Sequence, residues 1–415
     1  MEADIGQVLA KAEPTDAAQA RAARRSLVAL FAATFVELTG LFLFGPLLLF
    51  TLKAQGLGTA AVGAFGALQW AGLLAATPFA SSWVQRLGAR PALLASGAVP
   101  FVALAGMVAT QNVALWAGLY FIAGMASALR WILAEATVAE LAPPDKRGRV
   151  MGLFAMMIGA TFMAGPALLS ALLAAGFKTD RVGWLAVALV GLGLLLLIPV
   201  RPGAQAAGAA QNSAQNSAQA PNTGWRGIWA ALRAAPVVML TGFVGGFFES
   251  GLASTLPLVG LAIGFSVALS ALLVSASGLG STLVAPLVGE LADRLPTALM
   301  RRACALACAL ATLALLLVPQ QGGLAWLIAF VWGGAGAALY TLAMVEIGHR
   351  HQGVALVNNT SVLVLAYTAG GLLAPAAGGL MLQWAPTLGF PALLLAVAAL
   401  GLWPGLFRYH RRRSN

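Results

Sequence analysis

The chain repeats itself, because its second half matches its first half at a separation of about 210 residues. Four pairs of matching features carry this register, at separations of 212, 210, 209 and 208 residues: Glu37 and Glu249, Trp116 and Trp326, Gly165-Pro166 and Ala374-Pro375, and Gln85-Arg86 and Asp293-Arg294. A repeat that holds its register over this length predicts two similar structural units in tandem.

Both units are strongly apolar. Of the 415 residues, 60% are hydrophobic and 9% are charged, whereas charged residues make up about a quarter of an ordinary soluble domain. Twelve apolar runs are each long enough to cross about 30 Å of hydrocarbon as a helix. They are 26–50, 59–82, 91–110, 113–138, 150–175, 182–200, 237–260, 266–289, 300–319, 323–346, 354–383 and 388–407. We therefore expect an all-α integral membrane protein, with twelve transmembrane helices in two pseudo-symmetric six-helix bundles, 26–200 and 237–407.

Basic residues gather on one side of this predicted topology. If the N-terminus is inside, the cytoplasmic segments hold 20 of the 24 Lys and Arg, and the outer loops hold Lys53, Lys178 and Arg181. This asymmetry predicts a multi-pass protein of a bacterial inner membrane with both termini in the cytoplasm. The net charge of +11 is then a topology signal, and we expect no nucleic-acid partner.

Three polar segments flank the bundles. The arm 1–25 lacks the apolar centre of a cleavable signal, so we expect the first helix to be retained. The segment 201–236 includes the tandem run QNSAQNSAQA at 211–220 and is typical of a flexible cytoplasmic linker. The residues 408–415 form a basic cytoplasmic tail. The chain has no nucleotide-binding Gly-Lys-Ser/Thr loop and no dense His/Cys/Asp cluster, so we expect no cofactor and no metal.

A loop motif connects the chain to a known family. The run GELADR spans Gly289 to Arg294, and the corresponding place in the first half reads SSWVQRLGAR. This pattern resembles the loop signature Gly-x-Leu-Ala-Asp-Arg-x-Gly-Arg-Lys of the major facilitator superfamily (MFS). The matching positions are Gly289, Leu291, Ala292, Asp293 and Arg294 in the second copy, and Arg86, Gly88 and Arg90 in the first. In the family the loop is thought to latch the two bundles on the cytoplasmic side. Gln85 stands where the family has Asp, which leaves the strength of that latch open.

Two further family patterns are partly present. Antiporters of the superfamily often carry Gly-x-x-x-Gly-Pro-x-x-Gly-Gly on helix 5. The corresponding residues here are Gly165 and Pro166 on helix 5, and Gly370, Ala374, Pro375, Gly378 and Gly379 on helix 11. They indicate a hinge or a seal against leak, or close helix packing alone. Tyr120 stands where the family often has an Arg on helix 4. The run from Tyr340 to Pro375, together with RWILAE on helix 4, resembles the YcaD-type bacterial subgroup.

Four acidic residues lie inside the predicted helices: Glu37, Glu135, Glu249 and Glu346. Glu37 and Glu249 lie near the middle of their runs, where a charged side chain costs at least about 2.5–3.5 kcal/mol. Each must therefore face a polar cavity, pair with a cation, or be protonated. Because burial favours the neutral form of a carboxyl, we expect at least one of the two to carry a proton or contact substrate. The alternative is a protonated Glu that ties two helices together.

Arg130 is the one basic residue that we place within a predicted span and away from its ends. It needs an anion, which the sequence leaves open as a carboxylate on another helix or an anionic substrate. Tyr340 occupies its place in the second half. Glu135 and Glu346, at matching repeat positions, predict a gate or an intermediate proton site, or partly solvated carboxylates near helix ends. Three polar side chains are further candidates for substrate contact: Gln69, Tyr120 and Asn358.

The resemblance and the buried charges together predict a secondary carrier. We expect proton-coupled efflux of a drug-like compound or metabolite by alternating access, with Glu37 and Glu249 as candidate proton carriers. Proton-linked uptake of a small organic anion or sugar is an alternative, and a non-transporting membrane scaffold or sensor is another. We expect no enzymatic activity, and a monomer whose partners are a small-molecule substrate, protons and the lipid bilayer.

Overall fold

The computed structural model describes residues 2–143, 147–202, 233, 235–292, 294–317, 322–350, 353–385 and 387–402. Every regular element in this part of the chain is helical. Eleven of its helices are long and apolar enough to cross a membrane, and Gly389–Leu402 is a shorter apolar helix. The predicted all-α membrane fold class is therefore confirmed. The predicted count of twelve transmembrane helices stays a prediction, because the twelfth run, 388–407, extends past the last described residue.

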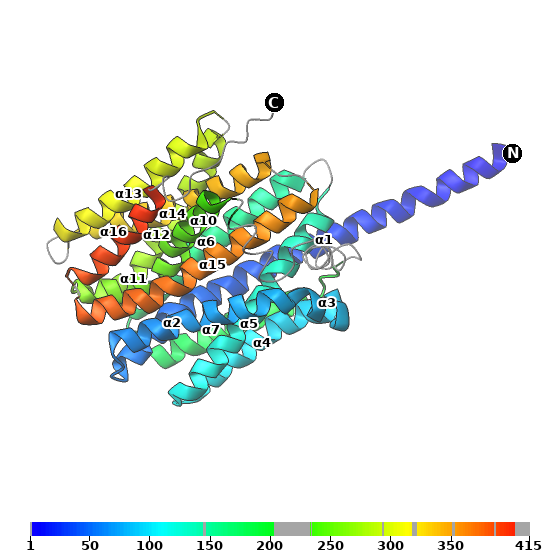
Figure 1. The fold of residues 1–415 in the computed structure, drawn as a ribbon. Helices are drawn as coiled ribbons and strands as arrows, with labels where there is room; N and C mark the ends of the chain where they lie inside the picture. Colours follow the sequence, from blue (N-terminus) through cyan, green and yellow to red (C-terminus); the bar gives the residue numbers. More distant parts are fainter. Residues whose placement is uncertain are drawn as a thin grey trace, which may run out of the picture.

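The described part of the first half contains six long helices and a short amphipathic one. In chain order they are α1 (Glu2–Ala54), α2 (Thr59–Ala76), a 3-10 turn (Thr77–Phe79), α3 (Ala80–Leu87), α4 (Ala89–Ala109), α5 (Val113–Leu141), α6 (Arg147–Ala174) and α7 (Thr179–Leu197). The predicted arm 1–25 belongs to α1, whose first turns project beyond the rest of the molecule (Figure 1). The predicted linker 201–236 and tail 408–415 lie largely or wholly outside the described residues.

The second half follows the same plan. Its elements are α10 (Pro236–Gly246), a π-helical turn η3 (Phe247–Gly251), α11 (Leu252–Ala262), α12 (Val267–Ala292), α13 (Thr297–Leu317), α14 (Leu324–Arg350), α15 (Gly353–Trp384) and α16 (Gly389–Leu402). Elements α10, η3 and α11 form one continuous span, Pro236–Ala262. This span corresponds to α1 in the repeat.

Glycines give the repeat a physical basis. A methyl group on Gly72 of α2 would overlap the Phe121 carbonyl oxygen of α5, and one on Gly124 would overlap the Gln69 carbonyl of α2. The same close approach joins α12 and α14 at Gly280 and Gly333. The pairs 72/280 and 124/333 are 208 and 209 residues apart, within the repeat register. Each half therefore uses small residues at equivalent places to bring two backbones into contact.

The two halves meet along two pairs of helices, α2 with α15 and α6 with α12. Two ends of the molecule can be defined: the linker end, where α7 ends and α10 begins, and the opposite end, where α1 ends and α2 begins. At the opposite end, Gly63 of α2 packs directly on Gly379 of α15. Near mid-span, the Ser275 hydroxyl of α12 donates a hydrogen bond to the Met163 carbonyl of α6 at 2.8 Å. The halves are thus in backbone contact at the opposite end.

A side chain from the second half caps a helix of the first half at this end. The N-cap residue of α2, Gly58, offers no side chain. The Gln383 carboxamide oxygen, at the end of α15, instead accepts a hydrogen bond from the Ala60 backbone N–H at 2.9 Å. Because separation of the halves would leave this N–H without its acceptor, the contact favours a closed opposite end.

We expect Gln383→Leu to weaken closure of the opposite end, because leucine cannot accept the Ala60 N–H. One hydrogen bond contributes about 0.5–1.5 kcal/mol, so the ratio of closed to open molecules should fall by up to about tenfold. Spin labels on Ala54→Cys and Leu388→Cys would report the change as a distance distribution. Gln383→Glu keeps an acceptor and is the matched control. An unchanged distribution in Gln383→Leu would show that the cap does not contribute to closure.

Candidate functional site

A central cavity of about 690 Å³ lies between the two halves. Its wall comes from helices of both halves, and it reaches Gly152 near the start of α6 and Gly289 near the end of α12. Both of these positions are at the linker end, whereas α2 and α15 are in contact at the opposite end. The cavity therefore opens toward the linker end. A cavity of this size between helix bundles is a typical place for a small-molecule site.

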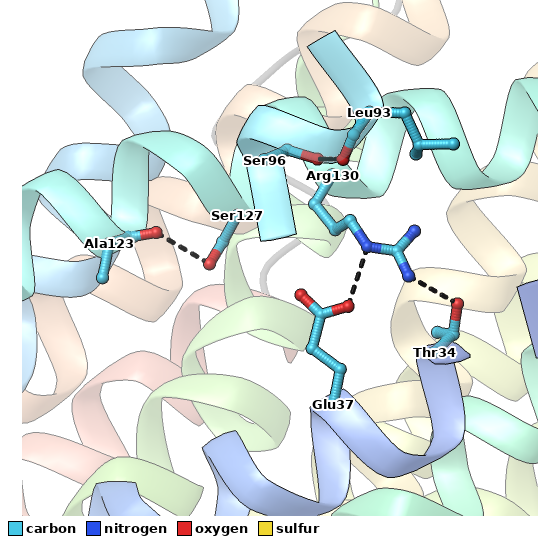
Figure 2. Close-up of polar contacts among 7 residues, drawn as sticks. All are labelled: Thr34, Glu37, Leu93, Ser96, Ala123, Ser127 and Arg130. Carbon is cyan, nitrogen blue, oxygen red and sulfur yellow. Dashed lines mark hydrogen bonds and ion pairs between the residues drawn. The ribbon is translucent and has the colours of Figure 1, made fainter. Parts of the chain in front are cut away.

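An ion pair between α1 and α5 forms one part of the wall. Arg130 Nε lies 2.9 Å from Glu37 Oε2, and Arg130 Nη2 donates a hydrogen bond to the Thr34 hydroxyl at 3.0 Å (Figure 2). The two charged side chains are only 7% and 2% exposed. Sequence reasoning left the anion for Arg130 open, and the structure supplies Glu37, a residue 93 positions earlier in the chain. Two charged residues that the sequence placed within separate predicted spans are thus brought together.

Glu249, the repeat counterpart of Glu37, has different partners. The Ser281 hydroxyl of α12 donates to Glu249 Oε1 at 2.6 Å, and the Tyr367 hydroxyl of α15 donates to Oε2 at 3.0 Å. Ser250 in turn hydrogen-bonds the Tyr367 hydroxyl. Glu249 is half-buried and lines the cavity. Both donors are neutral, so among the described residues this carboxylate has hydrogen bonds and no counter-ion.

The backbone around Glu249 departs from a regular α-helix. Residues Phe247–Gly251 form a π-helical turn between α10 and α11. Such turns interrupt the regular hydrogen-bond ladder and are frequent at functional sites. Gly246, just before the turn, packs against the Tyr367 backbone, which brings α15 close enough for the phenol to reach the carboxylate. No pattern in the sequence marked this turn.

The matching acids Glu135 and Glu346 lie in unlike surroundings. Glu135 is exposed, lines the cavity and accepts a hydrogen bond from Trp131 Nε1 at 2.7 Å. Glu346 is buried, 3.1 Å from Arg301 Nη1 of α13 and 2.6 Å from Arg350 Nη2. Glu346 is absent from the cavity wall. Only Glu135 of the two lines the cavity, and the gate predicted from both acids stays a prediction.

The scarce tyrosines gather at the cavity. The chain has four, and Tyr120, Tyr340 and Tyr367 all line the wall. The Tyr120 hydroxyl donates to Gln69 Oε1 at 2.7 Å, and the rings of Tyr340 and Tyr367 lie 4.6 Å apart. The Asn358 side chain lies outside the described residues. Tyr120 and Gln69, both predicted candidates, thus form one hydrogen-bonded pair across α5 and α2.

The loop motif is described only in part. Gln85 and Arg86 are exposed at the end of α3, and Gly88 makes the turn into α4 with a φ of +86°, which favours glycine. Arg90 Nη2 donates to the Ile198 carbonyl at 3.2 Å, at the end of α7. The Arg294 N–H bonds the Leu291 carbonyl. Asp293 lies outside the described residues, so the predicted latch stays a prediction.

The small-residue motifs of helices 5 and 11 lie at helix crossings. Gly165 of α6 packs on the α1 backbone at Thr39, and Pro166 faces the cavity. On α15, Gly370 packs on α10 and Gly378 lies beside Thr255 of α11. Also on α15, Pro375 and Gly379 contact Gly63 across the interface of the two halves. The hinge or seal stays a prediction, beside the close packing seen at each of these crossings.

Four residues of these networks were missed by sequence reasoning: Ser281, Tyr367, Arg301 and Arg350. Ser281 and Tyr367 bind Glu249, and Arg301 and Arg350 bind Glu346. The rarity of tyrosine in this chain was the one available signal for Tyr367. Nothing in the pattern of α12 distinguishes Ser281 from its other small hydroxyl residues.

Comparison with known proteins agrees with this geometry. The model of the Major Facilitator Superfamily matches residues 30–364. A curated relative, the Uncharacterized MFS-type transporter YfkF of Bacillus subtilis (strain 168), is 24% identical over 121 residues. These residues are 29% of this chain and 31% of that relative, so the match spans about a third of each protein.

Solved structures share the fold across nearly the whole chain. The human organic anion transporter MFSD10 (TETRAN) has a TM-score of 0.62 and 19% identity, over 92% of this chain and 98% of that one. A D-xylose-proton symporter has a TM-score of 0.72 and 14% identity, over 94% and 97%. A mutant of the nucleoside transporter NupG has a TM-score of 0.70 and 14% identity, over 92% and 97%. At these identities the likeness concerns the fold alone.

Proposed function

Because this chain belongs to the Major Facilitator Superfamily, and is therefore a multi-pass membrane transporter and not an enzyme, we propose that it couples the efflux of a small molecule to protons carried by Glu249. The substrate passes through the central cavity by alternating access. The host membrane is a bacterial inner membrane, with the linker end of the molecule in the cytoplasm. The placement of the basic residues supports this orientation.

The observation that carries the proton assignment is the contrast between Glu249 and Glu37. Protonation of Glu37 would remove the counter-ion of Arg130, whose side chain is 7% exposed. Loss of one partner of a buried ion pair costs about 3–5 kcal/mol. Protonation of Glu249 breaks no ion pair, because its donors are hydroxyl groups. Glu249 is therefore the better carrier of the two.

The hydroxyl groups around Glu249 suit both protonation states. A hydroxyl can donate or accept a hydrogen bond. Ser281 and Tyr367 therefore donate to the carboxylate, and either can rotate to accept from the carboxylic acid. The cavity gives the group a path to water at the linker end. A carboxyl group that keeps its hydrogen bonds in both protonation states, and that water can reach, meets the requirements of a proton carrier.

Efflux is favoured over uptake of an organic anion. The Nε and Nη2 donors of Arg130 are held by Glu37 and Thr34, so the cation that would recruit an anion is already neutralised. The glycine- and proline-rich stretch of α15 resembles the pattern found in antiporters. The sign of the proton movement separates the two directions, because antiport and symport move protons oppositely for the same substrate gradient.

We expect Glu249→Gln to abolish substrate-driven proton movement in proteoliposomes. Glutamine keeps the size and the acceptor but cannot change its charge. The assay follows a luminal pH dye while drug-like compounds, first selected for movement by the wild type, are added. The signal should fall to that of protein-free liposomes, while downhill substrate exchange persists. Glu290→Gln, an exposed carboxyl outside the cavity wall, is the matched control. Unchanged proton movement in Glu249→Gln would refute the assignment.

A further inference from the structure

The charged residues of the cavity wall do not balance. The lining residues include three carboxylates, Glu37, Glu135 and Glu249, and one basic side chain, Arg130. Arg130 pairs with Glu37, which leaves the other two carboxylates with Trp131, Ser281 and Tyr367 as hydrogen-bond donors. Those donors are neutral. Within the described part of the chain, the wall therefore presents negative charge that no lining cation offsets.

The positive guanidinium of Arg130 does not offset this negative charge, because it is already paired. Its Nε and Nη2 are bound to Glu37 and Thr34, and its Nη1 is buried without a hydrogen-bond partner among the described residues. Figure 2 shows the guanidinium held across the carboxylate of Glu37 and the hydroxyl of Thr34. An anion would have to displace Glu37 or Thr34, or reach the buried Nη1, before it could bind. In contrast, Glu135 is exposed and Glu249 is half-buried.

One aromatic side chain shares the cavity wall with both of the remaining carboxylates. Tyr340 of α14 lines the cavity together with Glu135 and Glu249. Its ring packs on that of Tyr367 at 4.6 Å, which fixes its position. Trp131, the hydrogen-bond donor to Glu135, is a second aromatic wall. Aromatic faces attract cations, most of all where water is partly excluded.

We propose that the cavity binds a bulky organic cation, such as a quaternary ammonium or a protonated amine with apolar substituents, against Tyr340 between Glu135 and Glu249. The proposal rests on the proposed function of the cavity as the transport site and names its substrate class. The volume of about 690 Å³ accommodates a multi-ring compound, and most of the wall is apolar or aromatic. The carboxylates select the charge, and the rings select for a delocalised or alkylated cation over a small hydrated one.

A pair of probes with one shape and opposite charge tests this assignment. Tetraphenylphosphonium is a cation and tetraphenylborate is its anionic counterpart. We expect the wild-type protein in detergent to bind radiolabelled tetraphenylphosphonium in a scintillation proximity assay, with no displacement by tetraphenylborate. Glu135→Gln should raise the Kd of the cation about tenfold, the effect of one charge contact in a partly wet site. Asp180→Asn, an exposed carboxyl on α7, is the control.

The role of the aromatic ring has its own pair of variants. Tyr340→Phe keeps the ring and should keep the cation affinity within about twofold, whereas Tyr340→Leu should weaken it about fivefold. Thermal unfolding of each variant in the same detergent shows whether it is folded, and only variants that unfold within the wild-type range enter the comparison. A loss specific to leucine indicates binding to the ring and not to its hydroxyl.

Several outcomes overturn the proposal. These are failure of the folded wild type to bind the cation, equal displacement by tetraphenylborate, or an unchanged Kd in Glu135→Gln. Binding in detergent requires neither a gradient nor transport, so these outcomes leave the proton role of Glu249 untouched. Conversely, proton movement that persists in Glu249→Gln refutes the coupling without affecting the cation site. The two proposals therefore fail separately.

Discussion

Arg130→Met is expected to lower the free energy of unfolding by about 3–5 kcal/mol, one of the largest losses that a single substitution in this chain should cause. Methionine replaces the unbranched aliphatic part of the arginine side chain, so the loss is electrostatic more than a packing defect. The change leaves Glu37, whose side chain is 2% exposed, without the guanidinium that lies 2.9 Å away. An unpaired buried carboxylate must be desolvated or take up a proton, and either costs stability.

A double-mutant cycle isolates the ion pair. Glu37→Gln alone leaves a buried guanidinium without its anion and should cost a similar amount. Glu37→Gln with Arg130→Met removes both charges, and we expect the double variant to recover most of the loss. Unfolding in mixed micelles of sodium dodecyl sulfate and dodecyl maltoside gives the four free energies. Additive losses would show that the two residues are not coupled.

The same cycle decides between the two interpretations of Arg130. If Arg130 binds substrate, Arg130→Met should lower the substrate affinity with little change in stability, and adding Glu37→Gln should not restore that affinity. If Arg130 is structural, Arg130→Met should lower the stability, and adding Glu37→Gln should restore it. The buried pair of Figure 2 favours the structural role, which is also why we assign the proton to Glu249.

The sequence predicted the fold through features that act locally. The length of each apolar run depends on its own residues, and the repeat register depends on matching residues such as Trp116 and Trp326. The structure adds the glycine pairs, such as Gly72 and Gly280, which hold the same register. The depth of Glu37 and Glu249 follows from counting residues along a helix. Both lie on the cavity wall, as a buried charge in a membrane protein should.

The partners of these charges could not be predicted, because they depend on how helices pack and rotate. Arg130 reaches Glu37 across 93 residues, and the closer Glu135 turns to Trp131 instead. Glu346 repeats the position of Glu135, yet it pairs with Arg301 of α13 and with Arg350, and it does not line the cavity. The two acids therefore have unlike surroundings, although the repeat alone treats them as equivalent.

The second large effect concerns the contact that holds the halves together at the opposite end. We expect Gly63→Val to shift the protein toward a state in which this end is open. A Cβ at Gly63 would overlap the Pro375 carbonyl oxygen and lie 2.7 Å from the Gly379 Cα. Overpacking of this kind costs about 1–3 kcal/mol, and here it destabilises only the conformation in which the opposite end is closed. The ratio of closed to open molecules should therefore fall about 5- to 150-fold.

A valine within one half should act differently. Gly124→Val would overlap the Gln69 carbonyl oxygen of α2, and both residues belong to the first half. Its helices pack together in either conformation, so no change of state relieves the strain. We expect Gly124→Val to lower the folded yield and the thermal stability. Gly118→Val, on the same helix but with open space around the added carbon, should change neither quantity.

Spin labels on Ala54→Cys and Leu388→Cys separate these outcomes. Ala54 ends α1 in the first half and Leu388 precedes α16 in the second half, and both positions lie at the opposite end of the molecule. Gly63→Val should broaden the distance distribution or move it to longer values while thermal stability stays near that of wild type. An unchanged distribution with lowered stability would mean that Gly63 serves packing alone. In that case the Gly63–Gly379 contact would not be what closes the cavity, and closure would depend on polar contacts such as the Gln383 cap, whose loss would then produce the larger change.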